Sequence, residues 1–278
     1  MKSNNILETK QTKTTLAKKL GISRGMLYYQ HRRPLSDEAL RVDIEAVMNV
    51  HKSYGHKRIA LELSLNKKRI LRVMKKFHLM PLKRRGKKPV KPDDMNKPGA
   101  QFKNEIERIC PLRADIIWVG DFTHIKFQDS WIYLATVMDR YTREIIGWHI
   151  STTHTKDLVI EAFLDALEKT KTAPLYFHSD QGSEYESDDY LKLVSNNGIK
   201  ISMSRKSHPW ENGHQESFYS GFKLDLGQTN DYQELGELFE AIAITMNYYN
   251  TLRIHTSLKT SPLKFRLSRE YLFKEMGT

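Results

Sequence analysis

Two kinds of hydrophobic spacing divide this chain of 278 residues. Up to about residue 82, apolar residues recur every three or four positions, as they do on one face of a helix. After Pro111 they form runs typical of β-strands, at residues 116–127, 131–139 and 143–151. Because only short polar connections join these three runs, we predict an antiparallel meander. The change of spacing thus predicts an all-α front part followed by a mixed α/β part.

Helices and short strands alternate after the meander. An amphipathic helix is expected first, and a buried strand then ends at a polar cluster that contains Asp180. The predicted elements are a helix at 156–170, a strand at 175–177, a helix at 188–196, a strand at 200–204 and helices from Gly213 and from 235 to 249. The stretch after Tyr249 looks irregular as far as Pro262. We therefore expect a mixed sheet covered by helices.

The front part contains two helical units. In residues 12–30, a short helix with Leu16 and Leu20 facing inward should stop at Gly21, and Ser23 should cap a second helix carrying Met26 and Leu27. This is the outline of a helix-turn-helix, a fold that often binds DNA. A helical hairpin that only packs on its neighbours fits the same pattern.

The second unit, from Asp43 to Met80, ends in a helix with one strongly cationic face. Ile70, Val73, Met74 and Phe77 form its apolar face. The cationic face consists of Lys67, Lys68, Arg69, Arg72, Lys75 and Lys76. Six cations in ten residues exceed what solubility requires, so contact with DNA phosphates is favoured over an ordinary solvated face.

Charge divides the chain in the same place. The net charge is +12, but residues 1–110 hold 27 Lys and Arg against 10 Asp and Glu, a net of +17. Residues 111–278 hold 18 against 23, a net of −5. A basic half joined to a mildly acidic half suggests a module that binds polyanions attached to one that bears carboxylates. Acidic substrates or anionic lipid would also explain the basic half.

Composition narrows the class of protein. The mean hydropathy of −0.59 argues against a membrane protein, and no apolar run approaches the length of a membrane span. The single cysteine, Cys110, excludes an internal disulfide and a cysteine-based zinc cluster. We expect a reducing, intracellular setting and no membrane partner.

Three carboxylates are the candidate chemistry. Asp121 interrupts the apolar run 117–123, and a charge within such a strand should be paired or metal-bound. Asp180 follows a buried strand, and Glu216 lies 35 intervening residues further on in a helical pattern. Singly they could be a surface residue, a loop cap and an ordinary helix residue. Together they could converge on a divalent metal, whose charge would offset their repulsion and assist displacement at a phosphodiester.

These residues resemble a known family, the retroviral-integrase-like transposases of bacterial insertion sequences, and particularly the product of the second of two overlapping reading frames. The likeness covers most of the chain. The matching segments are 54–59, 118–125, 178–185, 202–206, 212–218 with Lys223 seven residues after Glu216, and 249–258. This sequence departs from the family where it has Glu211-Asn212-Gly213 for Asp-Asn-Ala and Arg253-Ile254 for an arginine-proline pair. Neither departure removes a candidate carboxylate.

The resemblance implies a ribonuclease-H-like mixed-sheet catalytic core preceded by all-α helix-turn-helix units. Asp121, Asp180 and Glu216 would be the catalytic residues and would bind two Mg²⁺ ions, with Mn²⁺ as a substitute. Lys223 would meet a DNA phosphate from the same helix face as Glu216. Arg205, Lys206 and His208 are further candidate DNA contacts, and Asn212 is expected to cap the catalytic helix.

We therefore expect a DNA transposase that cuts at element ends and transfers strands into target DNA. Its partners would be double-stranded DNA, namely terminal repeats and target, further copies of the same chain, and an upstream-frame partner or fusion. A nuclease of the same fold and a DNA-binding regulator are the alternatives. The expected divisions are a helix-turn-helix-like unit at 1–36, a second helical DNA-binding unit at 37–82, a basic Pro-rich linker at 83–110, the core at 111–228 and a C-terminal helix and tail at 229–278.

Overall fold

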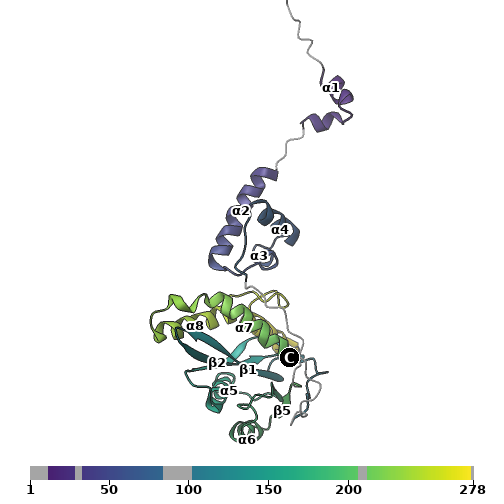
Figure 1. The fold of residues 1–278 in the computed structure, drawn as a ribbon. Helices are drawn as coiled ribbons and strands as arrows, with labels where there is room; N and C mark the ends of the chain where they lie inside the picture. The colour runs from purple at the N-terminus through teal and green to yellow at the C-terminus, as the bar shows by residue number, and fades with distance from the viewer. Residues whose placement is uncertain (1–11, 29–32, 84–101, 206–211, 277–278) are drawn as a thin grey trace, which may run out of the picture.

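The computed structural model describes residues 12–28, 33–83, 102–205 and 212–276 (Figure 1). A short N-terminal element leads into a three-helix unit, and a five-stranded sheet with helices on both faces follows. Most of the expected linker, residues 84–101, lies outside the described residues.

The sheet is mixed, as the sequence predicts. Its strands are β1 (Ile117–Phe127), β2 (Ser130–Asp139), β3 (Ile145–Ser151), β4 (Tyr176–Ser179) and β5 (Lys200–Met203). Their order is β3-β2-β1-β4-β5. The first three form the predicted antiparallel meander, while β4 runs parallel to β1 and β5 runs parallel to β4. The central strand β1 therefore has one antiparallel and one parallel neighbour.

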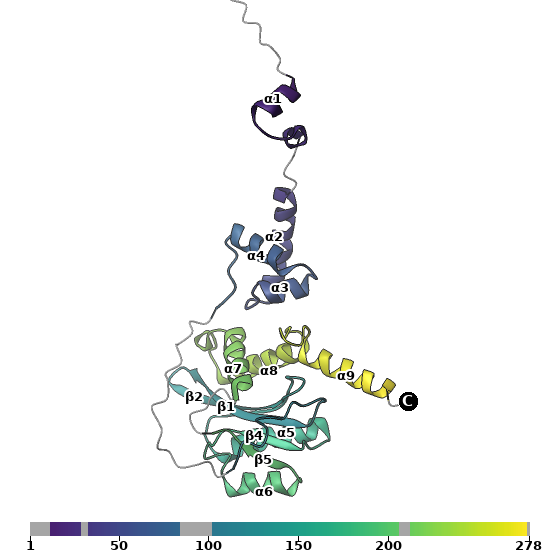
Figure 2. The same cartoon turned by 90° about the vertical axis from the view of Figure 1, so that its right-hand side faces the viewer.

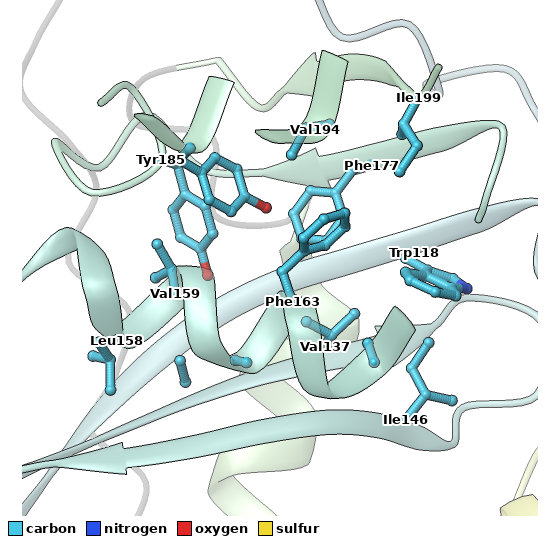
Figure 3. Close-up of a cluster of buried hydrophobic side chains, with 14 of the residues drawn as sticks. Trp118, Val137, Ile146, Leu158, Val159, Phe163, Phe177, Tyr185, Val194 and Ile199 are labelled. Atoms are coloured by element: carbon cyan, nitrogen blue, oxygen red, sulfur yellow. The ribbon is translucent and has the colours of Figure 1, made fainter. Parts of the chain in front are cut away.

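One face of the sheet packs on α5 (Lys156–Thr170) and α6 (Asp188–Asn196), at the positions expected for both helices. Figure 3 shows the buried cluster between the sheet and these two helices, in which Trp118, Phe163 and Phe177 are packed together. Gly147 on β3 permits this close approach, since a Cβ there would come within 2.4 Å of the Ala162 carbonyl oxygen of α5. A larger side chain at this position would push the helix off the sheet.

The opposite face packs on α7 (Gly213–Leu226) and α8 (Leu235–Thr251), again near the predicted positions. Alternate residues of β2 serve the two faces, because Ile132, Leu134 and Met138 join the α7–α8 cluster while Ala135 and Val137 join the α5 cluster. Figure 2 shows α7 and α8 on one side of the sheet and α5 and α6 on the other. The sheet is thus the middle of three layers, as in the expected α/β core.

The helical unit consists of α2 (Arg33–Val50), α3 (His56–Glu62) and α4 (Lys67–Lys76). Its own core also encloses Ile254, which comes from the segment after α8. The Ile254 amide donates to the Tyr54 hydroxyl at 2.6 Å, and Arg58 Nε donates to the Ile254 carbonyl at 2.9 Å. His51 Nδ1 lies 2.7 Å from the Tyr248 hydroxyl. These contacts attach the helical unit to the last helices of the core.

The N-terminal unit differs from its prediction. A helix, α1 (Lys13–Lys19), is followed by a 3-10 helix, η1 (Arg24–Tyr28), rather than by a second α-helix. Leu16 and Leu20 were expected to face inward, but 38% and 58% of their surfaces are exposed. Of residues 12–26, only Ala17 is buried. Two such short elements are too small to enclose leucine side chains without a further layer.

A terminal helix, α9 (Pro262–Met276), lies where the sequence pattern indicated only a tail. Arg266 holds it on the core, with its Nη1 donating to Asp115 at 2.9 Å and its Nε to Glu144. Figure 2 shows α9 projecting from the sheet layers toward the C-terminus. Because polar contacts anchor this helix, the spacing of its apolar residues is too weak a signal to predict it from the sequence.

Candidate active site

Two of the three candidate carboxylates lie side by side because their strands are parallel neighbours. Val119 of β1 pairs with His178 of β4, and continuing that register by two residues brings Asp121 level with Asp180. Asp121 Oδ1 accepts from the Phe122 amide at 2.8 Å, and Asp180 Oδ1 accepts from the Gly182 amide at 3.1 Å. Each carboxylate is therefore oriented by a nearby backbone donor.

Glu216 reaches this site from the first turn of α7, where its side chain is exposed. Its neighbours fix the helix on β1. Gln215 Nε2 donates to the Val119 carbonyl at 2.7 Å, and the Tyr219 hydroxyl donates to the carbonyl of Asp121 itself at 2.6 Å. The Tyr219 hydroxyl also lies 2.8 Å from Thr136 Oγ1. Neither Gln215 nor Tyr219 was predicted from the sequence, although both lie within one turn of Glu216.

The electrostatics of the site favour binding of a cation. Burial, and then the charges of Asp180 and Glu216, raise the pKa of Asp121 to about 8. Burial, followed by the charges of Glu184 and Glu186, also raises the pKa of Asp180. Both shifts show that the site destabilises the ionised form of these two carboxylates. A cation at the site would offset their negative charge, so its binding is favoured. Within the described ranges, no group of three or more His, Cys, Asp or Glu side chains is already close enough to form a metal cage.

A fourth carboxylate, not predicted from the sequence, lies beside the site. Glu184 is buried, and its Oε1 is 3.2 Å from Nε2 of His154. The His154 ring stacks on Tyr133 and is tilted against Phe122, the residue after Asp121. Because this contact joins residues far apart in sequence, no local pattern could reveal it. It gives the carboxylate site a wall of aromatic rings.

The predicted DNA contacts near the site have varied surroundings. Lys223 lies two turns after Glu216 on α7, and its Nζ donates to the His124 carbonyl of β1 at 2.7 Å. Arg205 is exposed and pairs with Glu107 at 3.1 Å. Lys206 and His208 fall outside the described residues. Asn212 occupies the N-cap position of α7, but its side chain makes no capping hydrogen bond, contrary to expectation.

All six predicted cations of α4 are exposed, but they are not equivalent. Arg72 binds the buried Asp37 carboxylate with two hydrogen bonds of 2.7 and 2.6 Å, and Lys76 approaches it at 3.1 Å. The hydrogen bond from Arg72 is the main cause that lowers the pKa of Asp37 far below its ordinary value. Lys67, Lys68, Arg69 and Lys75 make up the rest of the exposed cationic face.

Comparison with known proteins identifies the family. Residues 111–209 match a family model described as an integrase core domain, and residues 197–262 match a second model of the same description. The chain is 35% identical to the transposase for insertion sequence element IS904 of Lactococcus lactis subsp. lactis (strain IL1403), over 82% of this chain and 94% of that protein. The chain belongs to the insertion-sequence transposases. This transposase is also 32% identical to the insertion element IS600 uncharacterized 31 kDa protein of Shigella sonnei, over 88% of this chain and 95% of that one.

A solved structure supports the fold. The transposase is similar to a chain of the simian T-cell lymphotropic virus intasome in complex with PP2A regulatory subunit B56 gamma, with a TM-score of 0.52 and 15% identity. The likeness covers 81% of this chain and 74% of that one. It confirms the ribonuclease-H-like core, and the family places the transposase among the polynucleotidyl transferases of the Asp-Asp-Glu type. No described helix has the length and apolar content needed to cross a membrane.

Proposed function

We propose that this transposase cuts DNA at the ends of its insertion sequence and joins the freed 3′-hydroxyls to target DNA. Asp121, Asp180 and Glu216 are the catalytic residues and bind two Mg²⁺ ions, for which Mn²⁺ substitutes. The observation that carries the proposal is the register of β1 on β4, which brings Asp121 level with Asp180, together with the docking of α7, which carries Glu216, on β1. Burial and the charges of these two neighbours raise the pKa of Asp121 to about 8. A site that disfavours its own negative charge suits a divalent cation.

The carboxylate oxygens are hard ligands of the kind that Mg²⁺ prefers. Bound there, the metal would supply charge to polarise a phosphodiester and to activate the attacking oxygen. The protein's own residues set the geometry. Gln215 and Tyr219 hold α7 against β1 and thereby keep Glu216 facing Asp121. Such pre-ordering lowers the cost of reaching the transition state, because these groups need little rearrangement during reaction.

Cationic groups outside the site would hold the DNA. Lys67, Lys68, Arg69 and Lys75 of α4 are exposed and suit the phosphate backbone, whereas Arg72 and Lys76 share their charge with Asp37. We include Lys223, which follows Glu216 by two turns of α7, and Arg205, which follows β5. Lys206 and His208 are included from the sequence pattern. The two helical units would recognise the terminal repeats.

Transposition requires two DNA ends to be brought together, so we propose that several copies of the chain assemble on DNA. The DNA partners are the terminal repeats and the target, in the bacterial cytoplasm at the nucleoid. An upstream-frame partner or fusion would join this assembly.

The reaction can be tested with purified transposase, duplexes carrying the two element ends, and a plasmid target. Joined product should form with Mg²⁺ or Mn²⁺ and should disappear when EDTA is added. Cleavage without joining would indicate a nuclease of the same fold. Specific binding without either reaction would indicate a DNA-binding regulator and would contradict the proposal.

A further inference from the structure

A cavity of about 400 Å³ lies where the helical unit, the β2–β3 connection, α7 and the segment after α8 meet. Ser53 and Arg58 line it from the helical unit, Arg143 from the connection, and Arg253 and His255 from the segment after α8. From α7, residues such as Ser217, Gly221 and Leu224 line it. These residues lie on a different face of α7 from Glu216 and Lys223, so the cavity is distinct from the carboxylate site.

The lining of this cavity is strongly cationic. Arg58, Arg143, Arg253 and Lys83 contribute to it, and none of its described lining residues is Asp or Glu. The buried Arg253 is paired with Asp225, which lies outside the lining. Among the described residues, no hydrogen bond or ion pair joins Arg58, Arg143 or Lys83 to a carboxylate. Gly221 makes room for Arg253, because a Cβ at Gly221 would lie 3.0 Å from its Nη2. Clustering of like charges is unfavourable unless an anion joins them.

Three of the lining residues also carry a buried polar atom that has no hydrogen-bond partner among the described residues. These atoms are Ser53 Oγ, Arg143 Nη1 and His255 Nδ1. Burial, and then the charges of Arg143, Arg58 and Arg253, lower the pKa of His255 to about 4. Its neutral ring can donate a single hydrogen bond. Buried donors without partners are uncommon, and several of them around one cavity suit a ligand with several acceptor oxygens.

We propose that this cavity is a phosphate-binding site built jointly by the helical unit and the catalytic helix. Guanidinium groups match the tetrahedral oxygens of a phosphate, and a site of this size admits one phosphate group with its substituents. A DNA backbone is one source of that group, an assignment that rests on the proposed transposition. Free inorganic phosphate is the other source. Either would connect Arg58 of α3 to the residues of α7, and so would couple the helical unit to the catalytic helix.

The first test is thermal unfolding of the full chain titrated with inorganic phosphate at constant ionic strength. Phosphate should raise the unfolding temperature of the native chain, because a ligand that binds only the folded state stabilises it. Arg143→Gln should weaken the apparent phosphate affinity by about tenfold or more, as expected for a lost charge-assisted hydrogen bond. Arg113→Gln, which removes the same charge from an exposed position, is the matched control and should leave the affinity unchanged.

A second variant covers the case in which Arg143→Gln fails to fold. Ser217→Glu places a carboxylate beside the cavity from an exposed helix position. It should raise the unfolding temperature in the absence of phosphate and remove most of the response to phosphate. Equal responses from the native chain, both cavity variants and the control would overturn the proposal, as would no response at all.

Competition with DNA distinguishes the two sources of phosphate. A fluorescent duplex is bound to the native chain and to Arg143→Gln, and inorganic phosphate is added at constant ionic strength. If phosphate displaces the duplex from the native chain but not from Arg143→Gln, the cavity binds the DNA backbone. If phosphate stabilises the chain but leaves duplex binding unchanged, the cavity binds free phosphate. Neither readout requires strand transfer, so failure of the proposed function would be seen separately.

Discussion

At the scale of single residues, the half-buried carboxylate of Asp121 makes stability depend on pH. Its pKa is about 8 in the folded chain, against an ordinary value of 3.8. The folded chain therefore holds this proton more tightly than the unfolded chain does. The contribution of the protonated Asp121 to the free energy of unfolding is complete below about pH 4 and is lost as the pH rises toward about 8. Above that range the ionised carboxylate disfavours folding by an amount on the order of a few kcal/mol.

Asp121→Asn should remove this dependence. In metal-free buffer, the unfolding temperature of the native chain should fall more steeply between about pH 5 and pH 8 than that of the variant. At about pH 8, Mg²⁺ should raise the unfolding temperature of the native chain but not that of Asp121→Asn. Asp129→Asn, at an exposed turn between β1 and β2, is the control and should behave as the native chain does. A variant that responds to Mg²⁺ as strongly as the native chain would argue against Asp121 as a ligand.

At the scale of elements, α7 is positioned by hydrogen bonds to β1 rather than by apolar contacts alone. Gln215 is fully buried, and its amide satisfies the Val119 carbonyl of the central strand. Gln215→Met should destabilise the chain by about 1–3 kcal/mol, because that buried carbonyl loses its donor. Strand transfer should fall as well, since Glu216 is the next residue. Gln228→Met, the same replacement at an exposed position just after this helix, should change neither quantity. Chemical denaturation and a joining assay would measure both effects.

The cationic face of α4 predicts a salt-dependent effect. Lys67, Lys68 and Lys75 are exposed on it, and replacing all three by glutamine should weaken duplex binding and reduce the slope of log affinity against log salt by about two to three units. Arg72→Gln should instead destabilise the helical unit, because it leaves the buried Asp37 without its bidentate partner. Fluorescence anisotropy over a salt series distinguishes the two effects. An unchanged slope for the triple variant would remove α4 from the DNA-binding surface.

The spacing of apolar residues along the chain was sufficient to predict most of the helices and strands and which face of each is buried. The alternating strands of the meander and the apolar stripe of α5 can be read from neighbouring residues, so the mixed sheet followed from the sequence. The parallel placement of Asp121 and Asp180 was not predicted, because it depends on the strand order, in which β4 lies beside β1. By contrast, periodicity predicts that Leu16 and Leu20 face inward, but both are exposed, because periodicity does not say whether another element covers them. Partners distant in sequence, such as Glu184 and His154, leave no local trace.

At the scale of the whole molecule, the backbone amide of Ile254 is one of the contacts that join the helical unit to the core, beside those of Arg58 and His51. The Ile254 amide donates to the buried Tyr54 hydroxyl, and proline has no amide hydrogen to donate. Ile254→Pro should therefore cost about 1–3 kcal/mol and loosen the docked unit. Hydrogen exchange should become faster in α3 and α4 while β1 and β2 stay protected. Ile254→Val, which keeps the amide and most of the side chain, is the control. Equal exchange in the two variants would show that this hydrogen bond does not hold the unit.

The central claim is that Asp121, Asp180 and Glu216 form one catalytic centre for joining DNA. The most direct measurement is strand transfer by Asp180→Asn, with duplex binding measured in parallel and the exposed Asp188→Asn as the matched control. Asp180→Asn should lose joining by at least about a thousandfold while its duplex affinity stays within about threefold of native, because only the reaction needs this carboxylate. Asp188→Asn should join DNA normally. Joining by Asp180→Asn at the native rate would contradict the account.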